Sequence, residues 1–218
     1  LPGLIVDVYG STAVVQAHSA GMHLVRNELA EAIIAEVKEV KQVYYKSENT
    51  LPFKADLNPQ DGFLISGDTS DNVAIENGLR FHVDWLRGQK TGFFIDQRDN
   101  RALLEHYSRN RSVLNMFCYT GGFSVYAMRG GALLVHSVDS SAKAIDLTNQ
   151  NIAFNFPDDQ LHASFAEDAF KFMATNEQVY DLVVLDPPAF AKHRDAVRNA
   201  LKGYKRLNAK AIAQIKTG

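Results

Sequence analysis

Apolar and polar residues in the first 88 positions follow the two spacings expected of a small α+β domain. Alternation around Tyr9-Gly10-Ser11 predicts a hairpin, and Asn77-Gly78 is typical of a second tight turn because both residue types tolerate left-handed backbone conformations. Apolar residues at helical spacing predict a helix over 20–38, and residues 48–61, which lack periodicity, predict a loop. The predicted strands fall at residues 4–8, 12–16, 63–66, 73–76 and 79–83.

From residue 91 onward, short apolar runs alternate with longer stretches of helical spacing. The predicted strands fall at residues 113–117, 133–138, 161–165 and 181–185. The predicted helices fall at residues 97–107, 122–129, 141–155, 167–175 and from 195 onward. Strands that alternate with helices of this length predict a doubly wound α/β fold, in which helices cover both faces of a parallel sheet.

Length and charge refine this picture. The chain has 218 residues, of which 46% are hydrophobic, and the change of pattern near residue 88 favours two modest cores over one large core. The net charge is only −2, but residues 189–218 hold eight Lys or Arg against one acid, whereas residues 1–188 hold 15 against 24. The basic end predicts a surface that faces phosphates.

Other compositional features exclude several classes of protein. The single cysteine, Cys118, excludes an intrachain disulfide and a thiolate cluster for zinc, and it favours a reducing cytoplasm. The seven His lack the spacings of metal enzymes, so we predict no metal, and no phosphate-binding loop of a kinase occurs. No apolar run approaches the roughly 20 residues of a membrane span. We expect a soluble cytoplasmic protein, and a homodimer remains open.

Four segments occur in the order expected of an S-adenosylmethionine site, at residues 113–123, 135–139, 166–170 and 183–190. In an open α/β sheet, ligands bind at the carboxyl ends of the strands, where the strand order reverses. Gly121 and Gly122 would let the backbone approach the ligand, and the following helix would direct its amides at a carboxylate. Asp139 would accept hydrogen bonds from the ribose hydroxyls. Asp168 would accept from the adenine amino group, with the Ala169 amide beside a ring nitrogen.

Each of these residues also has a plain structural interpretation. Asp139-Ser140-Ser141 could cap the next helix, Asp168 could complement a helix dipole, and Gly121-Gly122 alone marks a tight turn. The joint order and spacing of the segments favour the cofactor site, because a series of helix caps has no reason to end in Asp-Pro-Pro.

The Asp186-Pro187-Pro188 sequence points to a nucleobase as the methyl acceptor. The two prolines fix an extended backbone and remove competing donors, which leaves carbonyls free to accept from a base edge. Asp186 would orient the base and handle its proton, so we predict that it is catalytic. Phe190 could stack on the flipped base or pack in the core.

A basic stripe follows in the last predicted helix. Its residues recur every four positions, with one further cation beside them: Arg194, Arg198, Lys202, Arg206, Lys210 and Lys205. An apolar stripe on the opposite side is predicted from Val197, Leu201, Tyr204, Leu207 and Ala211. A solvated face would explain the charges, but their position just after Asp-Pro-Pro favours contact with RNA phosphates.

The sequence resembles the RlmI-like class I S-adenosylmethionine-dependent methyltransferases, which methylate carbon 5 of a cytosine in large-subunit ribosomal RNA. The matching segments are LPGLIVDVYG at the start, FHVDWLRGQKTGFFIDQRDNR at 81–101, VLNMFCYTGGFSVYA at 113–127, VDSSAKAIDLTNQNIAFN at 138–155, LDPPAF at 185–190 and KGYKRLNAKAI at 202–212. The resemblance implies an RNA-binding α+β domain over residues 1–88 and a Rossmann-like methyltransferase domain over 89–218, with large-subunit ribosomal RNA as partner.

Together with the resemblance, the motifs give the full set of predicted site residues. The predicted cofactor-binding residues are Gln97, Arg98, Asn115, Phe117, Tyr119, Thr120, Gly121, Gly122, Asp139, Ser140, Asp168, Ala169 and Asp186. The predicted RNA-binding residues are Arg194, Arg198, Lys202, Lys205 and Arg206.

Two departures from the family pattern limit the resemblance. The family begins with a PUA domain, which we do not expect within residues 1–218, and its sheet of about seven strands is expected to be incomplete at the C-terminal end of this chain. Methylation of cytosine carbon 5 requires a cysteine thiolate that adds to carbon 6, and the family's cysteine is expected beyond residue 218. Cys118, in the cofactor turn, is predicted to pack beneath the ligand. We therefore expect a truncated chain that is inactive alone.

Two other functions remain open. Methylation of a guanine ring nitrogen or of an exocyclic amine needs no covalent intermediate and is compatible with Asp-Pro-Pro. A noncatalytic RNA-binding assembly factor could also retain the fold.

Overall fold

The computed structural model describes residues 1–52, 57, 59–65, 67, 72–191 and 194–216, which form two compact units, Leu1–Asp96 and Gln97–Gly218. The predicted division after residue 88 differs from this one by eight residues, because residues 89–96 belong with the first unit. The Tyr9 hydroxyl explains the difference: it lies 2.9 Å from the Thr91 hydroxyl and donates to the Phe93 carbonyl at 3.2 Å. Hydrogen bonds thus tie the end of this segment to the first strand.

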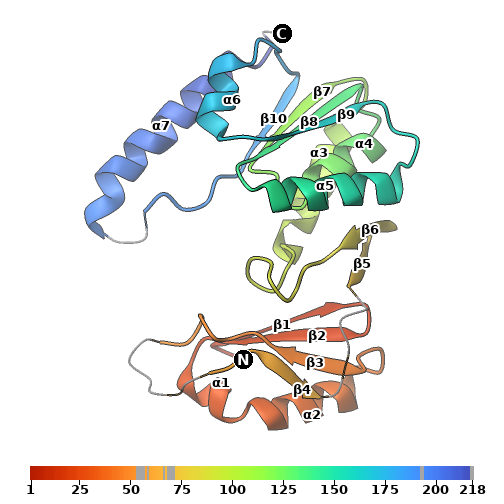
Figure 1. Cartoon of the computed structure of the whole chain (residues 1–218), viewed down its shortest axis with the longest axis vertical. Coiled ribbons are helices and arrows are strands. Elements are labelled where there is room, and N and C mark those ends of the chain that lie inside the picture. The colour runs from red at the N-terminus through yellow and green to blue at the C-terminus, as the bar shows by residue number, and fades with distance from the viewer. Residues whose placement is uncertain (53–56, 58, 66, 68–71, 192–193, 217–218) are drawn as a thin grey trace. The chain divides into compact units, whose positions relative to one another are not determined.

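The first unit contains a four-stranded sheet with two helices and a separate hairpin (Figure 1). Strands β1 (Leu4–Tyr9), β2 (Thr12–Ala17), β3 (Gln42–Tyr45) and β4 (Gly62–Ile65) form the sheet in that order, and β5 (Val73–Glu76) pairs with β6 (Leu79–His82). The helices are α1 (Ala20–Leu24) and α2 (Arg26–Glu36). Both predicted hairpin turns are confirmed, and Asn77 and Gly78 have the positive φ angles, 50° and 82°, that their turn requires.

Two predictions for this unit were wrong. The predicted helix over 20–38 is two helices, because the chain leaves helical geometry at Val25, which has φ −99° and ψ 19°. Strand β3 was missed, because all four of its residues are buried and so no alternation marks it. Parts of the predicted loop over 48–61 and of the predicted strand over 63–66 lie outside the described residues.

The second unit is a parallel sheet with helices on both faces, as predicted. Its strands are β7 (Ser112–Met116), β8 (Leu134–Asp139), β9 (His162–Ala166) and β10 (Leu182–Leu185), in the order β10-β7-β8-β9. Its helices are α3 (Arg98–Tyr107), α4 (Gly122–Arg129), α5 (Ala142–Asn155), α6 (Ala169–Thr175) and α7 (Val197–Ala213). A short 3₁₀ turn at Arg194–Ala196 precedes α7, and another at Ile95–Gln97 spans the boundary between the two units. The strand order reverses between β7 and β10, which is the position that binds ligands in such sheets.

Strand β7 contributes to a separate core on each face of this sheet. Val113 packs with Ala127, Ala132 and Val135 on the face covered by α4. Leu114 and Met116 pack with residues of α6 and α7 on the other face, including Phe172 and Leu207. Because successive residues of a strand point to opposite faces, Asn115 lies on the α4 face with Val113. After α7 the backbone returns to the sheet, where Ile215 forms a parallel bridge with Tyr180 just before β10.

Candidate functional site

The register of the parallel sheet aligns the tips of its strands. Leu185 pairs with Met116, and Met116 pairs with Val138. The next residue of each strand is therefore at the same level, which aligns Asp186, Phe117 and Asp139 along the carboxyl edge. Asp139 in turn pairs with Ala166, two residues before Asp168. Segments that are far apart in the sequence thus bring the predicted acids to one edge of the sheet, beside the point where strand order reverses.

The turn between β7 and α4 has an unusual backbone. Phe117, Tyr119 and Gly121 have positive φ angles of 57°, 49° and 74°. A side chain in this left-handed region costs roughly 1–2 kcal/mol, and non-glycine residues that adopt it cluster at functional sites. Because every second residue is left-handed, the chain curls over the tip of β7. There the Cys118 amide donates to the Val138 carbonyl at 3.0 Å, and the Gly121 amide donates to the Cys118 carbonyl at 2.8 Å.

Asp139 joins this turn to the next loop. Its Oδ2 accepts from the Tyr119 amide at 3.0 Å, and its Oδ1 accepts from the Ser141 amide at 2.9 Å. Ser141, not Asp139, caps α5, because the Ser141 hydroxyl accepts from the Ala144 amide at 3.3 Å. Each carboxylate oxygen of Asp139 keeps a second lone pair for a ligand donor. Ser140 is exposed between the two residues.

Asp168 caps a helix, whereas the sequence suggested for it, besides the adenine contact, an acid that complements a helix dipole. Its Oδ1 accepts from the amides of Phe170 and Lys171, both at 3.0 Å, and so the residue is the N-cap of α6. Ala169 is the buried first residue of that helix. A cap of this kind leaves the second oxygen, Oδ2, for other donors.

Asp186 is exposed after the tip of β10, and the segment that follows it is fixed to α7. The Phe190 ring stacks on the Tyr204 ring with centroids 4.4 Å apart and planes at 22°, and the Phe190 amide donates to the Tyr204 hydroxyl at 3.2 Å. A Cβ on Gly203 would lie 3.0 Å from the Phe190 ring. Of the two interpretations that the sequence allowed for Phe190, stacking on a base or packing within the protein, the structure shows packing against α7.

Gln97 and Arg98 lie at the start of α3. This helix packs beside α4 in the same direction, since Arg101 contacts the Tyr126 ring near its start and Glu105 pairs with Arg129 near its end. The start of α3 is therefore the end nearest the start of α4 and the glycine turn. The Gln97 side chain accepts from Asn100 at 2.8 Å, and Arg98 is exposed.

Two residues on α5 that the sequence analysis did not single out hold the glycine turn. The Thr148 hydroxyl donates to the Tyr119 carbonyl at 3.0 Å, and the Asn151 amide donates to the Thr120 carbonyl at 2.9 Å. Both side chains are fully buried. The sequence did carry a signal for them, because Thr148 and Asn151 lie three residues apart on the otherwise apolar buried stripe of α5.

Cys118 lies beneath the same turn as a buried thiol. Its Sγ is 3.6 Å from the Thr148 hydroxyl. Burial raises the pKa of the Cys118 thiol to about 12, so the residue is protonated at neutral pH. Because the thiolate is the nucleophilic form, Cys118 is unsuited to attack a base.

On the predicted basic face of α7, Arg198, Lys202, Lys205 and Arg206 are exposed and Lys210 is half-buried. The Arg194 side chain lies outside the described residues. Arg206 also has an intramolecular contact, since its guanidinium lies 4.2 Å from the centre of the Phe170 ring. The predicted apolar stripe was partly wrong: Val197 and Leu201 are 45% and 63% exposed. The buried residues of α7 are Ala200, Leu207 and Ala211, because only a narrow stripe of the helix contacts the sheet.

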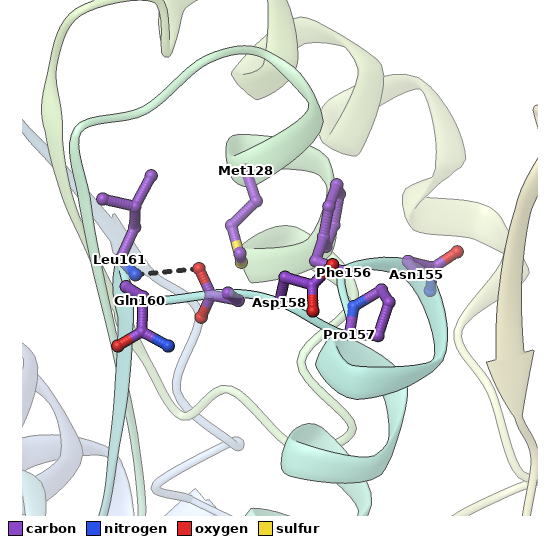
Figure 2. Close-up of a pocket in the computed structure, with 8 residues that line it drawn as sticks. Met128, Asn155, Phe156, Pro157, Asp158, Gln160 and Leu161 are labelled. Carbon is purple, nitrogen blue, oxygen red and sulfur yellow. Dashed lines mark hydrogen bonds between the residues drawn. The ribbon is translucent and has the colours of Figure 1, made fainter.

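A separate hollow of about 510 Å³ lies between the end of α4 and the loop that precedes β9 (Figure 2). It is lined by Met128, Asn155, Phe156, Pro157, Asp158, Asp159, Gln160 and Leu161. Because it lies where β9 begins, it is at the opposite edge of the sheet from the aligned strand tips. No cluster of three or more potential metal ligands occurs among the described residues, and no helix in that part of the chain has the length and apolar character needed to cross a membrane.

A parallel α/β sheet with a strained turn after its first strand and acids at the following strand tips defines a class I methyltransferase domain. The family model of S-adenosylmethionine-dependent methyltransferases matches residues 58–212. The chain belongs to this family.

The chain is also similar to ribosomal RNA methyltransferases along its whole length. Ribosomal RNA large subunit methyltransferase I of Alteromonas mediterranea is 39% identical over 100% of this chain and 55% of the relative. The ribosomal RNA large subunit methyltransferase of Deinococcus radiodurans is 36% identical over 100% of this chain and 54% of the relative. The chain thus spans about half the length of these curated relatives. The predicted resemblance is confirmed at the level of the family.

Solved structures agree on the fold. The structure of SMU.776 complexed with SAH has a TM-score of 0.82 and 25% identity, over 99% of this chain and 55% of that one. The complex of aTrm5 with tRNALeu has a TM-score of 0.69 and 20% identity, over 98% of this chain and 57% of that one.

Proposed function

We propose that this chain holds S-adenosylmethionine at the carboxyl edge of its parallel sheet and forms the cofactor-binding part of an enzyme that methylates large-subunit ribosomal RNA. The observation that carries the proposal is the alignment of Phe117, Asp139 and Asp186 by strand register. Phe117 is also the first of the three left-handed residues in the turn after β7. The similarity to ribosomal RNA large subunit methyltransferases supports the substrate class.

The chemistry of the available groups fits such a cofactor. Helix α4 begins at Gly122 without a side-chain cap, so its first amides can donate to the cofactor's carboxylate. Asp139 retains lone pairs for two ribose hydroxyls, and Asp168 retains one oxygen for the adenine amino group. When bound, the cofactor would supply an electrophilic methyl group. Asp186, exposed at the neighbouring strand tip, would orient the base that receives it.

Calorimetry with S-adenosylhomocysteine tests the cofactor site. We expect the wild-type chain to bind this product, and Asp139→Ala to weaken binding at least tenfold because a carboxylate that bonds two hydroxyls is lost. Asp146→Ala is the matched control, since Asp146 is an exposed acid on α5 and should leave the affinity unchanged. Equal affinity of the wild type and Asp139→Ala would contradict the proposed ribose contact, and no heat of binding to the wild type would contradict the cofactor site itself.

We propose that the RNA lies along the exposed basic face of α7. This face follows the Asp186 segment in the chain and is fixed to it by the Phe190–Tyr204 stack. The predicted RNA-binding role of the first unit also stays a proposal, as does a location in the cytoplasm, where ribosomal RNA would be met.

The proposed acceptor atom is carbon 5 of a cytosine. A thiolate would first add to carbon 6, and carbon 5 would then take the methyl group from the sulfonium, which leaves as S-adenosylhomocysteine. Loss of the carbon 5 proton would then expel the thiolate from carbon 6 and restore the base. The proposal therefore assigns the nucleophile to a cysteine beyond residue 218. One observation favours a second candidate, methylation of a guanine ring nitrogen or an exocyclic amine: Cys118 is buried as a protonated thiol and cannot supply the thiolate.

Mass mapping of ribosomal RNA from a strain that lacks the full-length protein separates the two candidates. A missing methyl on carbon 5 of a cytosine supports the carbon reaction, and a missing methyl on a guanine ring nitrogen or on an exocyclic amine supports the other. As a second readout, a cysteine-free version of the full-length protein should be inactive only if the reaction proceeds through a thiolate.

A further inference from the structure

A chain of hydrogen bonds crosses the α4 face of the second sheet. The Asn115 side-chain amide donates to the Ser124 hydroxyl at 2.9 Å. The Ser124 and Ser137 hydroxyls are 2.6 Å apart, and the Ser137 hydroxyl is 2.8 Å from Nε2 of His162. The chain therefore runs from β7 through α4 and β8 to β9. Asn115, Ser124 and Ser137 are at most 1% exposed, so water cannot replace these partners.

With Nδ2 of Asn115 as the donor to Ser124, the bonding capacity of each group gives the chain one direction. Ser124 accepts from the Asn115 amide, so its own proton is available for Ser137. Ser137 then donates its proton to the Nε2 lone pair of His162, and every hydroxyl donates once and accepts once. This arrangement requires neutral His162 with its proton on Nδ1. Burial lowers the pKa of His162 to about 4, which keeps the ring neutral at physiological pH.

The position of His162 is itself fixed by the loop before it. The carboxylate of Asp159 accepts from the backbone amides of Leu161 at 2.8 Å, drawn in Figure 2, and of His162 at 3.0 Å. These bonds hold the start of β9 in register with β8, where His162 pairs with Val135. The imidazole therefore offers its acceptor at a defined place.

The direction of the chain determines how the Asn115 amide is turned. With Nδ2 bonded to Ser124, the carbonyl Oδ1 points away from that hydroxyl. If His162 were replaced by a side chain without an acceptor, Ser137 could donate to Ser124, and Ser124 could then donate to Asn115 and favour the opposite amide orientation. Asn115 is the second-last residue of β7 and lies two positions before the left-handed Phe117.

We infer that His162 is a positioning residue for the cofactor: through the hydroxyls of Ser137 and Ser124 it fixes the amide orientation of Asn115 at the tip of β7. This inference rests on the proposed function, because it takes Asn115 to be part of the cofactor site. His162 acts through the chain and does not touch the ligand.

A set of variants tests the inference by titration with S-adenosylhomocysteine. His162→Phe removes the acceptor and keeps a planar ring, and we expect it to weaken binding about tenfold. His162→Gln can present a carbonyl oxygen to Ser137 and should stay within about threefold of the wild type. His18→Phe is the matched control, because His18 is exposed in the first unit and should leave the affinity unchanged. Asn115→Ala should weaken binding, and adding His162→Phe to it should cause no further loss.

Nuclear magnetic resonance of the Asn115 side-chain amide in the unliganded chain gives a second readout. His162→Phe should shift both amide proton signals, and His162→Gln should restore them towards the wild type. Unchanged signals, or additive effects of Asn115→Ala and His162→Phe on affinity, would overturn the inference. If the wild type binds no S-adenosylhomocysteine, the proposed function fails, and the amide signals still decide whether His162 orients Asn115.

Discussion

The carboxylate of Asp139 holds the backbone amide of Tyr119 at 3.0 Å, although the two residues are 20 positions apart in the chain. This contact joins the tip of β8 to the left-handed turn after β7. Because the other carboxylate oxygen binds the Ser141 amide, a single side chain organises both loops at the carboxyl edge. Asp139 therefore has a structural role in addition to its proposed contact with a ribose.

Replacing Asp139 by Asn should destabilise the second unit. An amide has only one acceptor oxygen, so its NH₂ group would face the backbone amide of Tyr119 or of Ser141, and one hydrogen bond to a charged group would be lost. We expect a loss of about 1.5–3 kcal/mol in the free energy of unfolding. Urea denaturation measures it, with the exposed Asp146→Asn as control. An unchanged midpoint for Asp139→Asn would show that the loops do not depend on this carboxylate.

The Asn151 side chain should matter for the turn although it lies on another helix. Asn151→Ala removes the side-chain amide that donates to the carbonyl of Thr120, a residue only 2% exposed, and a buried unsatisfied group costs about 1–3 kcal/mol. We expect both lower stability and weaker binding of S-adenosylhomocysteine. Gln150→Ala, one residue earlier on the exposed side of α5, is the control and should change neither quantity. If the two variants bind the ligand equally, the hydrogen bond from Asn151 to the Thr120 carbonyl has no role in ligand binding.

Gly121 is subject to two separate constraints that can be measured apart. Its φ is +74°, and a Cβ there would lie 2.6 Å from Cγ2 of Thr148. Gly78 also has a positive φ, +82°, but a Cβ there meets nothing within 4 Å. We therefore expect Gly78→Ala to lower the free energy of unfolding only by the backbone strain that it introduces, roughly 1–2 kcal/mol. Gly121→Ala should lower it by more.

Thr148→Ser removes Cγ2 and keeps the hydroxyl that bonds the Tyr119 carbonyl. The loss caused by Gly121→Ala should therefore be smaller in the Thr148→Ser background, as measured by a double-mutant cycle in urea. Equal losses in both backgrounds would show that contact with Thr148 is not what requires glycine at position 121.

The sequence predicted the second unit better than parts of the first unit. The second unit was predictable, because short segments rich in apolar residues alternate with helices of regular spacing, and strand order then fixes where ligands bind. The alignment of Asp139 and Asp186 follows from that topology alone. The break at Val25 and the four buried residues of β3 depend on tertiary packing, which leaves no periodic signal in so short a segment.

The partners of the predicted site residues were beyond the reach of spacing arguments. Thr148, Asn151 and His162 act through hydrogen bonds to residues that are 25 to 31 positions away. Only the fold shows which polar side chains meet. The same limit applies to Phe190, whose ring could have faced a base or the core until its stack on Tyr204 was visible.

The basic face of α7 gives a prediction about RNA affinity and salt. Lys202 is exposed on this face, and Lys202→Gln should weaken RNA binding and reduce the slope of log K against log salt by about 1 if it neutralises one phosphate. Filter binding with a ribosomal RNA fragment over a range of salt concentrations measures the slope. Arg109→Gln is the control, because Arg109 is exposed at the amino edge of the sheet. Equal slopes of log K against log salt for both variants would show that α7 is not part of the RNA interface.

The buried histidine at the end of the hydrogen-bonded chain makes the stability of the protein depend on pH in a definite window. Burial lowers the pKa of His162 from 6.5 to about 4, against the opposing charge of Asp159. Between pH 6.5 and 4 the unfolded chain therefore binds a proton at this residue that the folded chain does not. Stability from His162 is fully present above pH 6.5 and is lost as pH falls towards 4, by up to about 3 kcal/mol.

His162→Gln isolates this contribution, because glutamine can keep the bond to Ser137 and does not titrate. His136, whose pKa burial also lowers, is present in both proteins; its charge also lowers the pKa of His162, so the difference between the two proteins reports His162 together with this coupling. Urea denaturation at several pH values should therefore give a steeper loss of stability for the wild type than for His162→Gln between pH 6.5 and 4, with a difference in slope of up to about 1.4 kcal/mol per pH unit. Parallel curves would mean that the folded protein protonates His162 as readily as the unfolded chain, so that burial would not keep the acceptor neutral below pH 6.5.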